Sequence, residues 1–276
     1  MTPTLHCGRF QLDLSRPRVM GIVNLTDNSF SGDGLRGQAN GAIAQGLRMV
    51  EEGAELLDLG AESSRPGAEP VSLQQELDRL LPVVAGLRDC GVPLSIDTVK
   101  PEVMRAAIDA GADLINDIAA LQAPGALAAV ADSQAAACLM HMRGEPRTMQ
   151  ADPHYDDVVG EVWAFLMDRV AACESAGISR QRIVIDPGFG FGKTLGHNLE
   201  LLRHLDRFVD TGLPVLVGMS RKSMLGQITG QPVGERISAG VAAALLAVQR
   251  GARIVRVHDV AATRDALAVW QAIEGA

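Results

Sequence analysis

The chain has 276 residues, of which 47% are hydrophobic and only 3% aromatic, so its core must be mainly aliphatic. Its net charge of −8 argues against nucleic acid as a partner, because such binding needs clustered lysine and arginine. The four cysteines form no C-x-x-C pair, which argues against a zinc ribbon or a redox dithiol and favours reduced, buried thiols. With neither a signal-peptide pattern nor a run of about 18 apolar residues, we expect a soluble cytoplasmic protein without a membrane partner.

A two-part unit recurs along the chain after a short hairpin at residues 4–6 and 10–12. A brief apolar run is followed by polar or Gly/Pro residues and then by a segment with helical periodicity. The apolar runs are residues 18–25, 55–61, 92–98, 112–118, 135–142, 182–188, 213–220 and 252–259. The helical segments are residues 40–52, 72–88, 101–110, 126–131, 156–176, 198–210, 235–250 and 263–274.

Nearly continuous apolar strands that alternate with helices indicate a parallel sheet covered on both faces. Eight such units with no linker predict an α/β fold, a (β/α)8 TIM barrel with a short N-terminal β-hairpin, in which residues 1–276 form one domain. A doubly wound sheet is the competing architecture. In a barrel, the chemistry lies at the carboxyl ends of the strands.

Polar side chains stand at all eight predicted strand ends. They are Asn24; Asp58 and Glu62; Asp97; Asn116 and Asp117; His141; Asp186; Ser220, Arg221 and Lys222; and Arg256, His258 and Asp259. Because unpaired polar groups in a closed barrel cost about 1 to 3 kcal/mol each, we expect a ligand to pair them. Asp97, Asn116 and Asp186 suit a heterocycle with several N–H donors, whereas Arg256 and His258 suit a phosphate or diphosphate. His141 is expected to be structural.

The segment Asp186–Thr194, DPGFGFGKT, ends in the Gly-Lys-Thr of a phosphate-binding loop, but its spacing is wrong. The P-loop pattern requires a glycine five residues before Gly192, and that position is Pro187. The segment therefore does not predict an ATPase or GTPase.

A set of motifs resembles the successive signature segments of the dihydropteroate synthases, in their order and rough spacing. They are MGIVNLTDNSFS (20–31), LGAESSRPGA (59–68), SIDT (95–98), LINDI (114–118), MHMRG (140–144), IDPGFGFGKT (185–194), GMSRKSMLG (218–226) and RVHDV (256–260). This resemblance implies a pterin-binding barrel, usually a homodimer, that joins 6-hydroxymethyl-7,8-dihydropterin diphosphate to p-aminobenzoate. Dihydropteroate for folate synthesis and free diphosphate are the products, and sulfonamides mimic p-aminobenzoate.

The resemblance also implies roles for individual residues, with Asp97, Lys222, Arg256 and His258 as the catalytic set. The pterin pocket would be Asp97, Asn116, Asp186 and Lys222, lined by Met140 and Gly218. The diphosphate site would be Asn24, Arg65, Arg256 and His258, with Mg²⁺ bound through Asn24. The p-aminobenzoate site would be Ser64, Arg65, Pro66, Phe191, Lys222 and Ser223, closed by Phe30.

The chain departs from the family pattern in the first loop, where Asp27 and Asn28 replace a Pro-Asp pair. Without the fixed φ of proline, this loop is expected to be more flexible. A catalytically silent pterin-binding homologue and a methyltetrahydrofolate-dependent corrinoid methyltransferase are the alternative functions. The second of these has no use for the Ser-Arg-Pro-Gly loop or for the pair Arg256 and His258.

Overall fold

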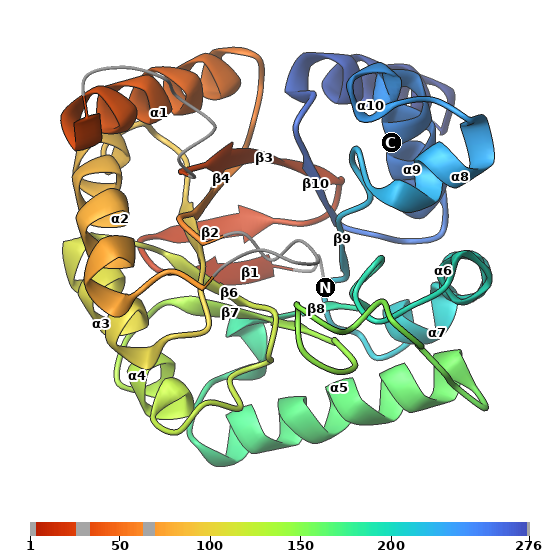
Figure 1. The fold of residues 1–276 in the computed structure, drawn as a ribbon, viewed down its shortest axis with the longest axis horizontal. Coiled ribbons are helices and arrows are strands. Elements are labelled where there is room, and N and C mark those ends of the chain that lie inside the picture. The colour runs from red at the N-terminus through yellow and green to blue at the C-terminus, as the bar shows by residue number, and fades with distance from the viewer. Residues whose placement is uncertain (1–3, 26–33, 63–69, 275–276) are drawn as a thin grey trace.

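The computed structural model describes residues 4–25, 34–62 and 70–274, with the side chains of residues 34–36 outside the description. Eight parallel strands form one sheet, and helices surround it on the outside (Figure 1). In sheet order the strands are β8 (Ile183–Asp186), β7 (Ala136–Met140), β6 (Leu114–Asp117), β5 (Leu94–Asp97), β4 (Leu56–Gly60), β3 (Arg18–Asn24), β10 (Ile254–Val257) and β9 (Leu216–Val217). A parallel bridge between Ile185 and Val215 joins the two end strands, so the sheet closes into the predicted barrel.

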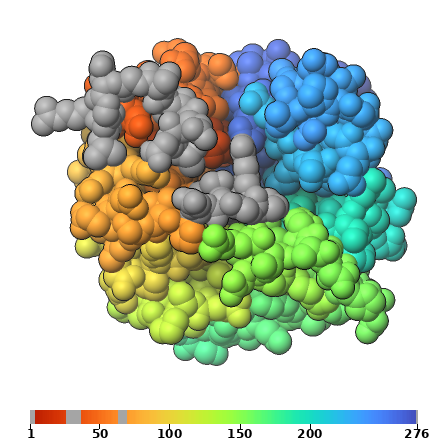
Figure 2. All heavy atoms as spheres, viewed as in Figure 1, coloured from red at the N-terminus to blue at the C-terminus, as the bar shows by residue number. Residues whose placement is uncertain are grey.

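The helices follow the strands in chain order around the barrel. They are α1 (Gly34–Glu51), α2 (Leu73–Leu87), α3 (Pro101–Ala110), α4 (Ala126–Ala131), α5 (Val158–Ser175), α6 (Leu195–Arg203), α7 (Asp206–Val209), α8 (Ser223–Thr229), α9 (Ile237–Gln249) and α10 (Val260–Glu274), with short 3-10 turns at Arg180–Arg182 and Val233–Glu235. Figure 2 shows the same ring as atoms, from orange through yellow and green to blue around one face of the molecule. Among the described helices, none is long and apolar enough to cross a membrane.

The hairpin at the N-terminus, β1 (Thr4–Cys7) and β2 (Phe10–Asp13), lies against the amino-terminal end of the barrel. Leu5 and Cys7 pack in a cluster inside the barrel with the first inward side chains of the strands, such as Met20 and Leu56. A larger cluster fills the space between the strands and the helices. The hairpin thus closes one end of the barrel and leaves the carboxyl ends of the strands for a site.

Several helix boundaries agree with the capping signals in the sequence. Ser72 caps α2, and Gln75 completes a capping box with it. Three predictions were wrong. The helix expected at 198–210 is two helices, because His204 leaves the helical region with φ −107° and ψ 32°. Helix α1 begins six residues before the predicted position 40, and α8 was not predicted.

Candidate active site

The pleat of the strands determines which side chains enter the barrel, because alternate residues point to the same face. Along β3, buried Met20 is followed at two-residue steps by Ile22 and Asn24, and the last two line the cavity described below. Asp58 on β4 and Arg256 on β10 stand one step beyond the apolar cluster inside the barrel. The barrel interior therefore changes from apolar to polar toward the carboxyl ends of the strands.

A cavity of about 360 Å³ opens at this end of the barrel. Eight of the predicted site residues line it, namely Asn24, Asp97, Phe191, Gly218, Lys222, Ser223, Arg256 and His258. The carboxyl ends of the strands thus bring together side chains that are up to 234 residues apart in the sequence, from Asn24 to His258.

Arg256 is the central cation of the cavity wall. Its Nε donates to Asp58 Oδ2 at 2.5 Å, and its Nη2 donates to Asp97 Oδ2 at 3.1 Å. Burial alone would lower the pKa of Arg256, but the two carboxylates outweigh that effect and raise it. The guanidinium is therefore a permanent positive charge with a fixed orientation.

Asp97 has an unusual environment for a carboxyl group. Burial raises the pKa of Asp97 to about 7, although Arg256 lowers it, and Asp58 raises it further. The side chain is still 16% exposed, so it reaches the cavity. A carboxylate that changes charge near neutral pH and faces a cavity has the properties of a functional group.

Lys222 provides a second cation of the cavity wall, in the segment that follows β9, the strand next to β10. Its Nζ donates to the carbonyl oxygen of Phe189 and lies 4.6 Å from the centre of the Phe191 ring. Burial lowers the pKa of Lys222 to about 8, against the opposite effect of Asp186. This lysine thus combines a positive charge at the cavity with an aromatic contact.

Asn116, Asp186 and Met140 do not line the cavity but are buried around it, each at most 5% exposed. Asn116 pairs with Asp97 in the strand register, and Asp186 pairs with Met140. Burial raises the pKa of Asp186, whereas Lys222 and the Gly188 N–H lower it. Two of the predicted pterin acceptors are therefore buried beside the cavity and not part of its lining.

Asn24, His258 and the residues that follow β9 also line the cavity. His258 contacts Ser220 Oγ through its backbone N–H at 3.2 Å and its Nδ1 at 3.1 Å. Arg221 has a positive φ of 60°, and its side chain forms two hydrogen bonds with Asp259. Such a conformation in a residue other than glycine is strained and is often found at functional sites.

The expectation that a ligand pairs every strand-end polar group was wrong for several of them. Asp259 pairs with Arg221, and Asp117 accepts from the backbone N–H groups of Ala119 and Leu121. Burial raises the pKa of Asp117 to about 6, against these two hydrogen bonds. Asp117 is thus a loop-capping residue, which the sequence pattern alone does not distinguish from a ligand.

Lys193, from the rejected phosphate-loop motif, is buried and faces the protein interior. Its Nζ contacts His141 Nδ1 at 2.9 Å and donates to the carbonyl oxygens of Gly188 and Phe191 at 2.9 and 3.0 Å. Burial, followed by Lys193, lowers the pKa of His141 to about 2. The pair supports the loop that carries Phe191, which agrees with the structural role expected for His141.

Five cavity residues had no role in the sequence prediction, and three further ones had been noted only as strand-end groups. The first set is Ile22, Met149, Gln150, Gly190 and Val233; the second is Glu62, Ser220 and Arg221. Met149 and Gln150 come from the connection between β7 and α5, which has no strand-end signal. Glu62 forms an ion pair with Lys100, which also pairs with buried Glu76 at 2.5 Å.

Four predicted site residues, Phe30, Ser64, Arg65 and Pro66, lie outside the described residues, as do Asp27 and Asn28 of the altered loop. The predicted closure by Phe30 and the contacts of Arg65 therefore remain predictions.

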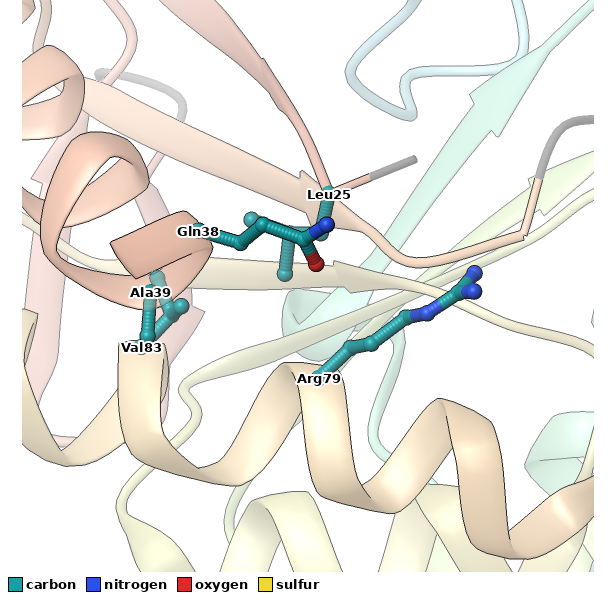
Figure 3. A pocket seen from close by; sticks show the side chains of 5 residues that line it. All are labelled: Leu25, Gln38, Ala39, Arg79 and Val83. Carbon is teal, nitrogen blue, oxygen red and sulfur yellow. The ribbon is translucent and has the colours of Figure 1, made fainter. Parts of the chain in front are cut away.

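A second hollow lies between α1 and α2, lined by Leu25, Gln38, Ala39, Arg79 and Val83 (Figure 3). Its volume of about 10 Å³ is about that of a single water probe, so it is too small for a substrate. Arg79 Nη1 donates to the carbonyl oxygen of Ala61 at 3.4 Å. This hollow is therefore a packing gap beside the end of β3.

Comparison with known proteins agrees with this site. The family model described as pterin binding enzyme matches residues 20–258. The dihydropteroate synthase of Haemophilus influenzae is 51% identical over 275 residues, which cover 99% of each chain. The structure of Xanthomonas albilineans dihydropteroate synthase with 4-aminobenzoic acid has a TM-score of 0.94 and 54% identity, with 100% of both chains covered. A Yersinia pestis dihydropteroate synthase structure with a sulfonamide drug complex has a TM-score of 0.94 and 47% identity, covering 99% of this chain and 100% of that one.

The fold and the site define a pterin-binding enzyme built on a (β/α)8 barrel. Within that class, the chain belongs to the dihydropteroate synthase family. The chain is accordingly an enzyme of the dihydropteroate synthase type.

Proposed function

We propose that the cavity at the carboxyl ends of the strands joins 6-hydroxymethyl-7,8-dihydropterin diphosphate to p-aminobenzoate through the residues predicted from the sequence. One observation carries this assignment. A single cavity wall holds Asp97, the register partner of buried Asn116, together with Arg256 and Lys222. Carboxylate and amide acceptors beside cations match a ligand with N–H donors at one end and an anion at the other.

The pterin binds at the deeper end in this proposal. Asp97, Asn116 and Asp186 accept hydrogen bonds from its N–H groups, while Lys222 donates to it. Met140 and Gly218 provide apolar and close backbone contacts. The burial of Asn116 supports this assignment, because its Oδ1 has no hydrogen-bond partner in the described part of the chain and a bound heterocycle would pair it.

The diphosphate binds near Asn24, Arg256 and His258, with Arg65 as the further predicted contact. The described residues contain no group of three or more His, Cys, Asp or Glu side chains suited to a metal ion. Mg²⁺ commonly keeps several waters and binds one or two protein oxygens plus substrate phosphates. The amide oxygen of Asn24, which lines the same cavity as Arg256, fits that pattern. When bound there, Mg²⁺ would neutralise charge on the departing diphosphate.

The p-aminobenzoate binds against Phe191, Lys222 and Ser223 in this proposal. Ser64, Arg65, Pro66 and Phe30 are its other predicted contacts. The position of Lys222 Nζ over the Phe191 ring supports the assignment, since it places a cation beside an aromatic surface. A carboxylate on an aromatic ring suits both features.

The mechanism follows from the charges on the cavity wall. The C–O bond to the diphosphate breaks first, and Arg256 and His258 stabilise the negative charge on the leaving oxygen. The pterin methylene becomes cationic, and Asp97 stabilises it across the short distance that separates them in a water-poor cavity. The amine nitrogen of p-aminobenzoate then attacks the methylene carbon and loses a proton. Exclusion of water prevents hydrolysis of the cation.

The alternative functions fit the site less well. A corrinoid methyltransferase has no use for the anion end formed by Arg256 and His258. A catalytically silent homologue would keep the pterin contacts but would not need the anion end of the cavity. We also propose that the chain acts as one domain, in the cytoplasm and as a homodimer. The exposed apolar side chains of Leu246 on α9 and of Val269 and Ile273 on the adjacent helix α10 support the dimer.

A direct assay tests the proposed function. Purified protein is mixed with the dihydropterin diphosphate, p-aminobenzoate and Mg²⁺, and both diphosphate and dihydropteroate are measured. We expect equal amounts of the two products, loss of both on chelation of the metal, and competition by a sulfonamide against p-aminobenzoate only. Binding of the pterin without any diphosphate release would instead support the silent homologue.

A further inference from the structure

Asp58 is a fully buried carboxylate that does not line the cavity and has no role in the mechanism above. It is the third residue of β4, between Ile22 on β3 and Ser95 on β5 in the strand register. An acidic side chain without any exposed surface is rare in proteins unless it is paired.

Three donors from three other strands converge on this carboxylate. Ser95 Oγ donates to Oδ1 at 2.5 Å. Arg256 Nε and Asn116 Nδ2 both donate to Oδ2, at 2.5 and 3.2 Å. Asp58 thus contacts two residues of the proposed substrate site without contacting the cavity.

The contact with Asn116 determines the orientation of its amide. An asparagine amide has nearly the same shape after a half turn, but the turn exchanges its donor and its acceptor. Arg256 can only donate, so Asp58 Oδ2 is an acceptor, and Asn116 must present its NH2 group to the same oxygen. Asn116 Oδ1 then faces away from Asp58.

Asn116 Oδ1 is buried without a hydrogen-bond partner, one of two such side-chain atoms in the described part of the chain, the other being Trp270 Nε1. Buried acceptors are nearly always paired, and leaving one unpaired is unfavourable. The unpaired atom is therefore the acceptor that a bound ligand would use.

We propose that Asp58 is a positioning residue for pterin binding, which holds the Asn116 amide with its oxygen directed to an N–H group of the pterin. The inference rests on the proposed function, because it needs the pterin to bind at Asn116. Asp58 also holds the Arg256 guanidinium, so charge neutralisation is the competing explanation for its burial.

Two substitutions separate orientation from charge. Asp58→Leu removes both acceptors at similar size. Asp58→Asn removes only the charge, since its oxygen can accept from Arg256 and Asn116 while its NH2 group donates to Ser95 Oγ. We expect Asp58→Leu to weaken the binding of 6-hydroxymethyl-7,8-dihydropterin, without diphosphate, by about tenfold or more in calorimetry. Asp58→Asn is expected to bind it within about threefold of the unsubstituted protein.

The pterin without diphosphate is the informative probe because it does not use the anion end of the cavity. In turnover, Asp58→Leu should raise KM for the dihydropterin diphosphate and leave KM for p-aminobenzoate unchanged. In an Asn116→Ala background, Asp58→Leu should have no further effect on pterin binding, since Asp58 acts through Asn116.

Equal losses of pterin binding in Asp58→Asn and Asp58→Leu would overturn the inference in favour of charge neutralisation. So would undiminished binding in Asp58→Leu, or an undiminished effect of Asp58→Leu in the Asn116→Ala background. If Asp58→Leu does not fold, Asp58→Asn alone decides between orientation and charge. Failure of the unsubstituted protein to bind the pterin would contradict the proposed function itself.

Discussion

Replacing Asp97 by asparagine is expected to lower kcat/KM for the dihydropterin diphosphate by about a hundredfold or more. The amide has the shape of the carboxylate and can still accept from Arg256 Nη2, but it carries no negative charge to stabilise the pterin cation. Steady-state kinetics with both substrates would measure the loss. Ser95→Ala, two residues earlier on β5, is the matched control and is expected to retain most of the activity.

The same residue predicts the pH dependence of the reaction. Because burial raises the pKa of Asp97 to about 7, the ligand-free enzyme loses the carboxylate as the pH falls through that value. We expect kcat/KM to fall about tenfold per pH unit below 7, and this limb to be absent from the residual activity of Asp97→Asn. A wild-type profile that is flat between pH 5 and 8 would contradict the role of Asp97.

The raised pKa of Asp97 also predicts that Asp97→Asn changes the stability of the protein in the opposite direction to its activity. The favourable contribution of Asp97 to folding is complete below its ordinary pKa of 3.8 and is lost as the pH rises through about 7. Asp97→Asn should therefore gain resistance to urea relative to the unsubstituted protein at pH 8, and this gain should shrink toward pH 5. A loss of activity together with a gain of stability would identify a functional carboxylate rather than a structural one.

Replacing Gly188 by alanine is expected to cost about 3 kcal/mol or more in the free energy of unfolding. Gly188 has φ +73°, and an added Cβ would lie 1.9 Å from the carbonyl oxygen of His141. The backbone would have to move, which would break the hydrogen bond from Gly188 N to Asp186 Oδ1 of 2.7 Å. We therefore also expect a higher KM for the dihydropterin diphosphate.

Gly212 provides a matched control, because its φ is +74° and an added Cβ would meet no atom within 4 Å. Gly212→Ala should cost only the backbone strain of a left-handed alanine, about 1 to 2 kcal/mol, with unchanged kinetics. Equal losses of stability in the two variants would show that the contact with His141 is not the cause.

Most of the barrel could be predicted because parallel strands are buried on both faces and leave a continuous apolar run. Each of the eight runs contains one observed strand, and α3 and α4 have the predicted bounds. The missed elements lack such a signal. Helix α8 has only seven residues, and the first turns of α1 contain Gly34 and Gly37, which lower helix propensity.

The polar residues at the strand ends predicted the candidate site where a side chain directly enters the cavity, as for Asn24, Asp97 and Arg256. They could not predict which side chains form hydrogen bonds or ion pairs with one another. Whether Asp259 meets Arg221, or Lys193 meets His141, depends on loop geometry that has no period in the sequence. The role of Asp58 depends on contacts with three other strands, which only the closed barrel brings together.

In the proposed mechanism, the diphosphate leaves before the amine attacks, and Asp97 faces the resulting cation. Single-turnover measurements with excess enzyme and saturating p-aminobenzoate would compare the dihydropterin diphosphate with the same compound dideuterated at the methylene carbon. A cation at that carbon predicts slower formation of dihydropteroate from the deuterated substrate, a normal secondary isotope effect. Equal rates for the two substrates would indicate direct displacement and contradict the role assigned to Asp97.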